Sequence, residues 1–304
     1  MPPPPAVDAE TRAPLHAAGC GCGLHRRRQL SLALLALVTG CATGTAPARE
    51  GVDVGKKSSF TKLVPAQKVE QAAAQQFVQL QRQAAAKNAL APPGDPQLVR
   101  LQYIAERLIP FTPPWNARAK QWRWEVSLIR SPQVNAFCMP GGKIAFFTGI
   151  LQQLQLDDDE VAMIMGHEMA HALREHARER IGKSMATRGA VEIGAALLGL
   201  NDAGRLLAGL GEQLLTLTFS REDESEADLV GMELAARAGY DPAAGVTLWR
   251  KMGAYSRGAP PEFLSTHPSG ATRIQDIEAN LPQVLPLYRR APKPTRRFGP
   301  PPRA

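Results

Sequence analysis

The segment 160–181 places the strongest constraint on the fold of this 304-residue chain. Three consecutive aspartates at 157–159 precede it and supply an N-cap and negative charge, both of which favour the start of a helix. The helix would be apolar on almost every side, so it should be buried in a core. It nevertheless contains His167, Glu168 and His171. Because buried polar groups need partners, the segment predicts a core helix whose polar side chains bind a ligand.

The sequence from His167 to His171 is an H-E-x-x-H pattern. Residues four apart share one face of a helix, so both imidazoles can reach one metal ion. Glu168 would lie beside an open coordination position, where it can take a proton from water. The alternative, a solvated helix with two surface histidines, conflicts with the apolar surroundings. The pattern therefore predicts a catalytic zinc site, which requires a third protein ligand.

His176 is a poor candidate for that ligand, because it lies about 140° around a continuous helix from His171; we expect it at the surface. The acidic stretch 221–228 offers Glu224 and Asp228, which are four residues apart and share a helix face. If Glu224 binds the metal, Asp228 is placed to accept the second ring N–H of a ligand histidine. The alternative is that this stretch is only a solvated, acidic start of a helix.

Four ordered motifs together resemble the M48 metallopeptidases, a gluzincin family. They are the H-E-x-x-H pattern, the Glu224 to Asp228 segment about 57 residues later, Asn135 to Ile144 (N-A-F-C-M-P-G-G-K-I), and Thr266-His267-Pro268 with Arg273-Ile274. The resemblance covers about residues 95–285. It is strongest to lipoproteins of the LoiP type within the Oma1-like branch.

The resemblance implies an α+β, mostly helical fold of the minigluzincin type. Its parts would be an active-site helix, a Glu-ligand helix and a small β-sheet whose edge strand aligns the substrate. The strand at 143–148 would receive an extended peptide by strand addition. The residues assigned to this substrate-binding edge are Asn135, Gly141, Gly142, Lys143, Ile144 and Ala145.

The same resemblance implies roles for individual side chains. His167, His171 and Glu224 would bind one Zn²⁺ per subunit, and Glu168 would act as the general base. His267 matches a position that stabilises the tetrahedral oxyanion. Arg273 matches a position that steadies the site near the glutamate ligand.

Residues 1–40 resemble a bacterial lipoprotein signal peptide. The basic stretch 25–28 precedes the apolar stretch 30–38, which is too short to cross a bilayer of about 30 Å. Cys41 follows Leu-Val-Thr-Gly, a sequence that resembles a lipobox, so we expect Cys41 to carry lipid. The alternative is an ordinary signal peptide with an incidental cysteine. Ala42 favours the periplasmic face of the outer membrane by resemblance to enterobacterial sorting.

The rest of the chain divides into three expected parts: a lipid-anchored tether at 41–64, a metallopeptidase domain at 65–288, and a basic, Pro-rich, disordered tail at 289–304. Periodicity and caps predict helices and strands within the domain. The expected helices are 65–88, 95–108, 188–218, 222–238, 242–252 and 272–280; the expected strands are 122–129, 136–137 and 143–148; residues 258–270 are expected to form a loop.

The formal net charge of +8 does not indicate nucleic-acid binding. Residues 1–40 contribute +2 and the tail at 289–304 contributes +6, which leaves the core close to neutral. We therefore expect no nucleic-acid partner.

The expected partners are unfolded polypeptide substrates, because strand addition requires an extended chain, and a membrane, which the protein contacts through its lipid. The predicted function is a zinc endopeptidase that removes unfolded or misassembled proteins from the cell envelope. The alternative is a non-catalytic periplasmic holdase or assembly factor with the same fold.

Two features have open interpretations. Cys138 lies within the substrate-edge segment, where it is either a small buried hydrophobe or a redox gate of the cleft. The apolar stretch 189–200 either covers the site as part of a helix or contributes to ordinary core packing.

Overall fold

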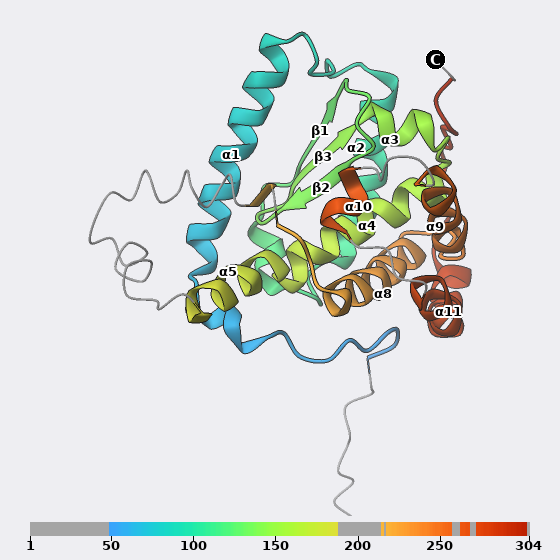
Figure 1. Ribbon diagram of the computed structural model, residues 1–304. Helices are drawn as coiled ribbons and strands as arrows, with labels where there is room; N and C mark the ends of the chain where they lie inside the picture. Colours follow the sequence, from blue (N-terminus) through green and yellow to red (C-terminus); the bar gives the residue numbers. More distant parts are fainter. Residues whose placement is uncertain (1–48, 188–213, 216, 257–261, 268–271, 303–304) are drawn as a thin grey trace, which may run out of the picture. The chain divides into compact units, whose positions relative to one another are not determined.

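The protein is described from a computed structural model, which places residues 49–187, 214–215, 217–256, 262–267 and 272–302. These residues form a mostly helical α+β domain with a small sheet (Figure 1), as predicted. The elements in chain order are η1 (Ser59–Leu63), α1 (Ala66–Ala86), α2 (Pro96–Leu108), η2 (Ile109–Phe111), η3 (Ala117–Gln121), β1 (Glu125–Ile129), β2 (Ala136–Met139), β3 (Lys143–Phe147), α3 (Thr148–Gln153), α4 (Asp158–Arg174), α5 (His176–Thr187), α8 (Arg221–Arg237), α9 (Ala244–Tyr255), α10 (Glu262–Thr266) and α11 (Thr272–Arg290).

The described sheet has the strand order β1-β3-β2. β3 pairs with β1 in parallel and with β2 antiparallel, so both of its edges are occupied. The prediction that the strand at 143–148 receives substrate at a free edge is therefore wrong. The short hairpin between β2 and β3 was visible in the sequence, but the pairing of β1 with β3 is long-range and leaves β2 as the outer strand on this side.

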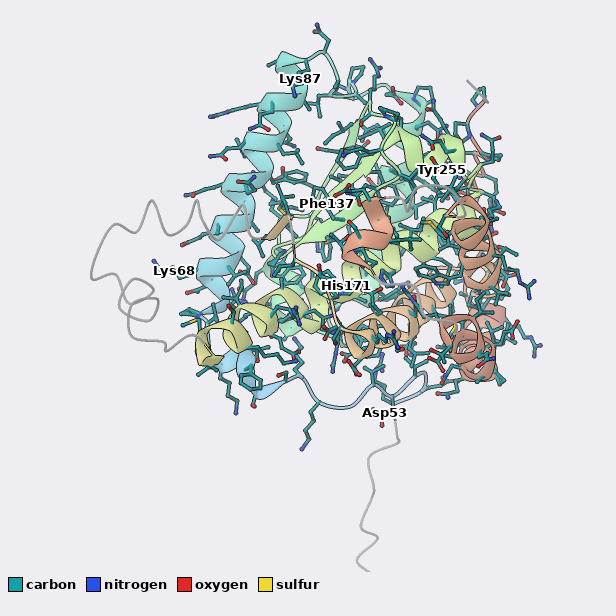
Figure 2. All side chains as sticks on the ribbon, viewed as in Figure 1. Asp53, Lys68, Lys87, Phe137, His171 and Tyr255 are labelled. Atoms are coloured by element: carbon teal, nitrogen blue, oxygen red, sulfur yellow. The ribbon has the colours of Figure 1, made fainter. Side chains whose placement is uncertain are left out.

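β3 is buried along its whole length because helices cover both faces of the sheet. On one face Ala145 packs with Ala73 and Phe77 of α1. On the other face Ile144 and Phe146 belong to the main core, which also contains α2, α4 and α8. Figure 2 shows His171 of α4 in the interior of the described domain, whereas Lys87, the residue after α1, lies at its outer edge. β2 of this sheet packs against α4, which carries the metal-binding pattern.

α4 begins with the cap expected from the sequence and ends earlier than expected. The Asp157 side chain accepts from the N–H of Glu160, and the Glu160 side chain accepts from the N–H of Asp157, which forms a capping box. Glu175 then adopts a left-handed conformation with φ of 65°. The chain restarts as α5 at His176, so the single helix predicted for 160–181 is in fact two helices.

α4 and α8 cross in close contact at two glycines. A Cβ atom added to Gly166 would lie 2.7 Å from the carbonyl oxygen of Gly231, and one added to Gly231 would lie 2.5 Å from the backbone nitrogen of His167. Such distances leave no room for a side chain. The two glycines therefore allow the backbone that carries His167 to approach the helix that carries Glu224.

The close crossing leads to a testable prediction about Gly231, which is not one of the expected metal ligands. Gly231→Ala is expected to push α8 away from α4, to lower the free energy of unfolding by about 1–3 kcal/mol, and to weaken zinc binding because Glu224 moves with α8. Gly253→Ala on α9 is the matched control, since nothing lies within 4 Å of its added Cβ. Thermal unfolding and zinc affinity check both variants. Wild-type zinc affinity in Gly231→Ala would contradict the account of the crossing.

Two terminal segments are packed rather than loose. Val52 is buried in the main core, and its backbone N–H donates to the buried carboxylate of Glu233 at 2.9 Å. At the other end, the backbone N–H of Phe298 donates to Asp158 at 2.7 Å and Arg297 pairs with Asp159. The tether from residue 49 onward and the tail through residue 302 are therefore docked, and the expectation of a disordered tail was wrong there. Apolar and charged contacts distant in the sequence hold both segments.

The last helices also differ from the prediction. Residues 262–266, expected as loop, form α10, and α11 continues to Arg290 through Pro282 and Pro286 instead of ending at residue 280. Most of the predicted helix at 188–218, and all of the apolar stretch 189–200 within it, lies outside the described residues. Within the described part of the chain, no helix is both long and apolar enough to cross a bilayer.

Candidate metal centre

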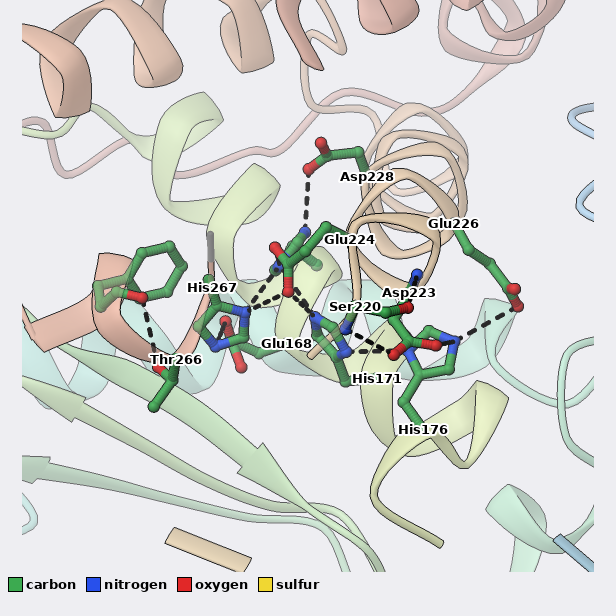
Figure 3. A network of polar contacts seen from close by, with 12 residues as sticks. Glu168, His171, His176, Ser220, Asp223, Glu224, Glu226, Asp228, Thr266 and His267 are labelled. Atoms are coloured by element: carbon green, nitrogen blue, oxygen red, sulfur yellow. Dashed lines mark hydrogen bonds and ion pairs between the residues drawn. The ribbon is translucent and has the colours of Figure 1, made fainter. Parts of the chain in front are cut away.

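α4 and α8 bring three of the predicted ligands together. Nε2 of His167 lies 3.1 Å from Nε2 of His171 and 3.4 Å from Oε2 of Glu224. Nε2 of His171 lies 3.4 Å from Oε1 of Glu224. All three side chains are buried, with 1–4 % of their surface exposed. Two histidines on one face of α4 therefore meet a carboxylate from α8. Figure 3 shows His171 and Glu224 of this group.

His267 joins the same cluster from the residue after α10. Its Nδ1 atom lies 3.0 Å from Oε1 of Glu224 and 3.4 Å from Nε2 of His167. Ligand atoms of the four residues all lie within 4.8 Å of one another. The backbone N–H of His267 donates to the carbonyl of Phe263, and the two rings stack with centroids 4.5 Å apart. The structure thus places His267 among the potential ligands.

Arg273 of α11 fixes the two carboxylates of α8. Its Nε and Nη2 atoms donate to the two oxygens of Asp228 at 2.6 and 2.7 Å, and Nη1 lies 2.7 Å from Oε2 of Glu224. Its guanidinium lies 3.5 Å from the ring centroid of Trp249 in α9. Asp228 also accepts from Nδ1 of His167 at 2.9 Å. This carboxylate–histidine arrangement holds the Nε2 atom of His167 toward the cluster.

The environment sets the charges of these groups. Burial favours the neutral form of His167, but hydrogen bonds to Asp228 and Glu224 outweigh it and raise its pKa to about 9. Burial lowers the pKa of His171 well below its usual range. Burial alone would raise the pKa of Glu224, yet contacts with the three histidines hold that pKa far below its usual value. Glu224 is therefore an anion at neutral pH, as a metal ligand must be.

Glu168 is set apart from the other acids. It is 2 % exposed, and among the described residues its Oε1 atom has no hydrogen-bond partner, with Nε2 of His267 3.5 Å away. Burial raises the pKa of its carboxyl group, while His267 and a backbone hydrogen bond from Cys138 work in the opposite direction. A raised pKa and an unused oxygen beside the cluster suit a group that takes up a proton.

The donor set fits zinc. Imidazole nitrogens and one carboxylate oxygen are the ligands that catalytic zinc sites use, whereas calcium and magnesium prefer oxygen alone. Two Nε2 atoms face each other at 3.1 Å beside an anionic carboxylate, and a cation placed between them would satisfy all three. His167, His171 and Glu224 are thus suited to hold the ion, with His267 next to them.

His176 contradicts the sequence-based expectation most clearly. It is 2 % exposed instead of lying at the surface, and its Nδ1 atom is 2.9 Å from Nδ1 of His171. The left-handed Glu175 turns the chain at this point, so the 140° rotation of a continuous helix does not apply. Burial is the main reason that its pKa is lowered to about 3. No local signal in the sequence marked the turn, since Glu175 is neither glycine nor proline.

A pocket opens between this cluster and β2. Glu168, His171 and His267 lie on one side of it, and β2 with Asn135 and Pro140 lies on the other. The outer strand β2, and not the strand at 143–148, therefore borders the site. Of the six residues expected at the edge, Asn135 lines the pocket, Gly141 and Gly142 form the turn, and Lys143, Ile144 and Ala145 lie in the central strand β3. The remaining lining residues are Ala172, Ala177, Leu214, Leu215, Leu217, Phe219 and Thr266.

Of the two cysteines with expected roles, the structure describes only Cys138. Cys138 lies on β2, is 8 % exposed, and has a pKa raised well above its usual value, mainly by burial. A thiol held in the neutral form reacts slowly with oxidants, which favours the interpretation as a small buried hydrophobe. Cys41 lies outside the described residues.

Comparisons with known proteins identify the family of this chain. The model of the family described as "Peptidase family M48" matches residues 97–281. Mitochondrial metalloendopeptidase OMA1 of Schizosaccharomyces pombe is 41 % identical over 164 residues, or 53 % of this chain and 48 % of that protein. Metalloprotease LoiP of Escherichia coli is 30 % identical over 195 residues, or 63 % of this chain and 73 % of that protein.

A further relative, the beta-barrel assembly-enhancing protease of Yersinia pestis, is 28 % identical over 56 % of this chain and 37 % of its own length. The match to OMA1 of Arabidopsis thaliana covers 34 % of that protein, so the chain spans between a third and a half of these mitochondrial relatives. The matched region includes α4, α8 and the first part of α11, which carry the cluster and Arg273. This chain belongs to peptidase family M48.

Proposed function

We propose that this protein is a zinc-dependent endopeptidase of the bacterial cell envelope that cleaves unfolded or misassembled proteins. The observation that carries the proposal is the buried cluster of His167, His171, Glu224 and His267 beside the unpartnered oxygen of Glu168. The names of three M48 relatives, a metalloendopeptidase and two proteases, support proteolysis as the reaction.

The reaction follows from the positions of these side chains. When bound, zinc would supply Lewis acidity toward a peptide carbonyl and toward the attacking water. Glu168 accepts the proton of that water and passes it to the leaving amine nitrogen. With both ring nitrogens protonated, His267 would donate from Nδ1 to Glu224 and from Nε2 to the negatively charged oxygen that forms. Arg273 and Asp228 keep Glu224 and His167 in place during the cycle.

The substrate would enter as an extended strand. β2 pairs with β3 through one of its edges, and its other side borders the pocket. Backbone groups of an extended peptide can pair with such an edge. A folded protein has already used those groups internally, so this mode selects unfolded chains. This binding mode is the reason for proposing quality control as the biological role.

The proposed location rests on the N-terminal sequence. A basic and apolar stretch before Cys41 supports a lipid-anchored protein at the periplasmic face of the outer membrane. Cys41→Ser is expected to move the protein out of the membrane fraction, whereas wild type should stay there. Wild type and variant in the same soluble fraction would argue against the anchor.

The proposal is tested with one substrate in two conformations. Full-length protein loaded with zinc is incubated with a disulfide-bonded protein in its native form and with the same protein reduced and alkylated. We expect cleavage of the unfolded form at a rate at least about tenfold above that of the native form. Binding of the unfolded form without any cleavage would instead favour the holdase alternative and overturn the proposed reaction.

A further inference from the structure

His176 occupies an unusual place beside the metal cluster. It is the first residue of α5, yet its ring lies edge-on to the ring of His171, with centroids 4.9 Å apart and planes at 75°. The two Nδ1 atoms are 2.9 Å apart. On its face, the ring of His171 stacks on Phe219 with centroids 3.9 Å apart. His171 is therefore held by one stacking contact and one hydrogen bond.

Only one assignment of protons lets His171 bind a metal. A neutral imidazole carries one N–H, and the other nitrogen offers a lone pair. Nε2 of His171 faces His167 and Glu224 at 3.1 and 3.4 Å, so this is the nitrogen that must keep its lone pair. The proton of His171 is then on Nδ1, and the group opposite must accept it.

His176 can accept that proton through Nδ1 when its own proton is on Nε2. Nε2 of His176 points toward α8, 3.6 Å from Oε1 of Glu226 and 4.0 Å from Oδ1 of Asp223 (Figure 3). Two carboxylates on this side favour the tautomer with the proton on Nε2. Glu226 is itself held by Arg174, the last residue of α4. The chain of contacts therefore runs from the cluster through two imidazoles to the start of α8.

We propose that His176 is a positioning residue for the metal ligand His171: it accepts the Nδ1 proton of His171 and thereby keeps the Nε2 lone pair directed at His167 and Glu224. The inference rests on the zinc site proposed above. It assigns different supports to the two histidine ligands, since His167 donates to the carboxylate of Asp228 and His171 to a neutral ring. Partners of this kind orient ligand histidines and strengthen metal binding.

The left-handed Glu175 explains how a residue five positions after His171 can take this role. Its φ of 65° ends α4, and α5 begins at the next residue. Arg178 donates to Glu175 at 2.7 Å and Lys57 donates to it at 3.3 Å, so both neighbouring segments hold the turn. The turn places the ring of His176 against His171 in a buried position. His176 thus reaches the site through the break between two helices and not through helical periodicity.

The test compares three replacements of His176 in the full-length protein by competition for zinc against a chromophoric chelator. In His176→Asn the side-chain oxygen can take the place of Nδ1, whereas His176→Gln and His176→Leu offer no acceptor at that place. We expect zinc affinity about 10–100-fold below wild type for the glutamine and leucine variants. The asparagine variant should lie within about threefold of wild type, because it retains the acceptor.

A matched control separates positioning from packing. Ile181→Val loosens the buried side of α5 against Val64 and α1, in a cluster that does not include His171, and its zinc affinity should equal that of wild type. Thermal unfolding of the metal-free proteins shows which variants fold. If the leucine variant does not fold, the zinc affinities of the glutamine and asparagine variants still test the role of His176.

The outcomes distinguish the two proposals. Wild-type protein that binds no zinc would overturn the proposed metal site, and this inference with it. Zinc binding by wild type with unchanged affinity in His176→Gln would overturn the role of His176 alone. Equal losses in the asparagine and glutamine variants would also contradict it, since the hydrogen-bond acceptor would then be irrelevant.

Discussion

Glu168→Gln is expected to lower kcat/KM for an unfolded protein substrate by about 10²–10⁴-fold without loss of zinc. The amide has the size of the carboxylate but cannot take a proton from water. Glu168 lies beside the cluster, not among the four residues whose ligand atoms converge. The variant should also be at least as stable as wild type, because burial already raises the pKa of this carboxyl group and so disfavours its charge.

The measurement pairs initial cleavage rates with zinc content determined on the same preparations. Glu106→Gln is the matched control, since Glu106 is exposed on α2, away from the site. It should retain wild-type activity. A Glu168→Gln protein that cleaves at the wild-type rate would remove Glu168 from the reaction, and one that has lost zinc would make it part of the metal site instead.

Glu224→Gln is expected to abolish both zinc binding and proteolysis. The substitution removes the anion that faces both histidines of α4, leaving Nε2 of His167 and of His171 without the carboxylate 3.4 Å away. It also removes one partner of the buried Arg273. Breaking a buried ion pair in this way costs about 3–5 kcal/mol of unfolding free energy, although Arg273 keeps its contact with Asp228.

Zinc content and denaturant unfolding, measured with and without zinc, separate these two effects. Wild type should gain stability when zinc is added, because a ligand that binds only the folded state stabilises it. Glu224→Gln should gain none. Glu222→Gln on the same turn of α8 serves as the control, since Glu222 is exposed. A zinc-dependent gain in stability for Glu224→Gln equal to that of wild type would exclude Glu224 as a ligand.

The parts of the fold that depend on local chemistry could be predicted from the sequence. The Asp95 cap and Pro96 gave the start of α2 correctly, and the acidic residues before position 160 gave the start of α4. Caps satisfy backbone N–H groups within a few residues, so nearby sequence contains the information. The spacing in H-E-x-x-H likewise requires only one regular helix, which is why His167 and His171 meet as expected.

The parts of the fold that depend on distant contacts could not be predicted from the sequence. The position of β3 in the centre of the sheet is set by its pairing with β1, about 18 residues earlier in the chain. The break at Glu175 is stabilised by Lys57 and Arg178, and no residue at the break favours a left-handed conformation. The docking of Phe298 depends on Asp158. Composition predicted disorder there because it does not reveal a tertiary partner.

The residues of the candidate site also fall into those that the sequence could predict and one that required the structure. Glu224 and Asp228 could be proposed from their spacing, and the family resemblance added His267 and Arg273. His176 was assigned to the surface because a continuous helix was assumed. Its place beside His171 depends on a tertiary turn, and the role proposed for it therefore required the structure.

The most direct test of the central claim is a zinc titration of the metal-free, full-length protein with cleavage of an unfolded substrate followed in the same samples. The account predicts that one zinc binds per chain and that the cleavage rate rises in proportion to the bound zinc until the site is full. A protein that binds one zinc tightly at the His167, His171 and Glu224 site, yet cleaves no unfolded substrate at full occupancy, would contradict it.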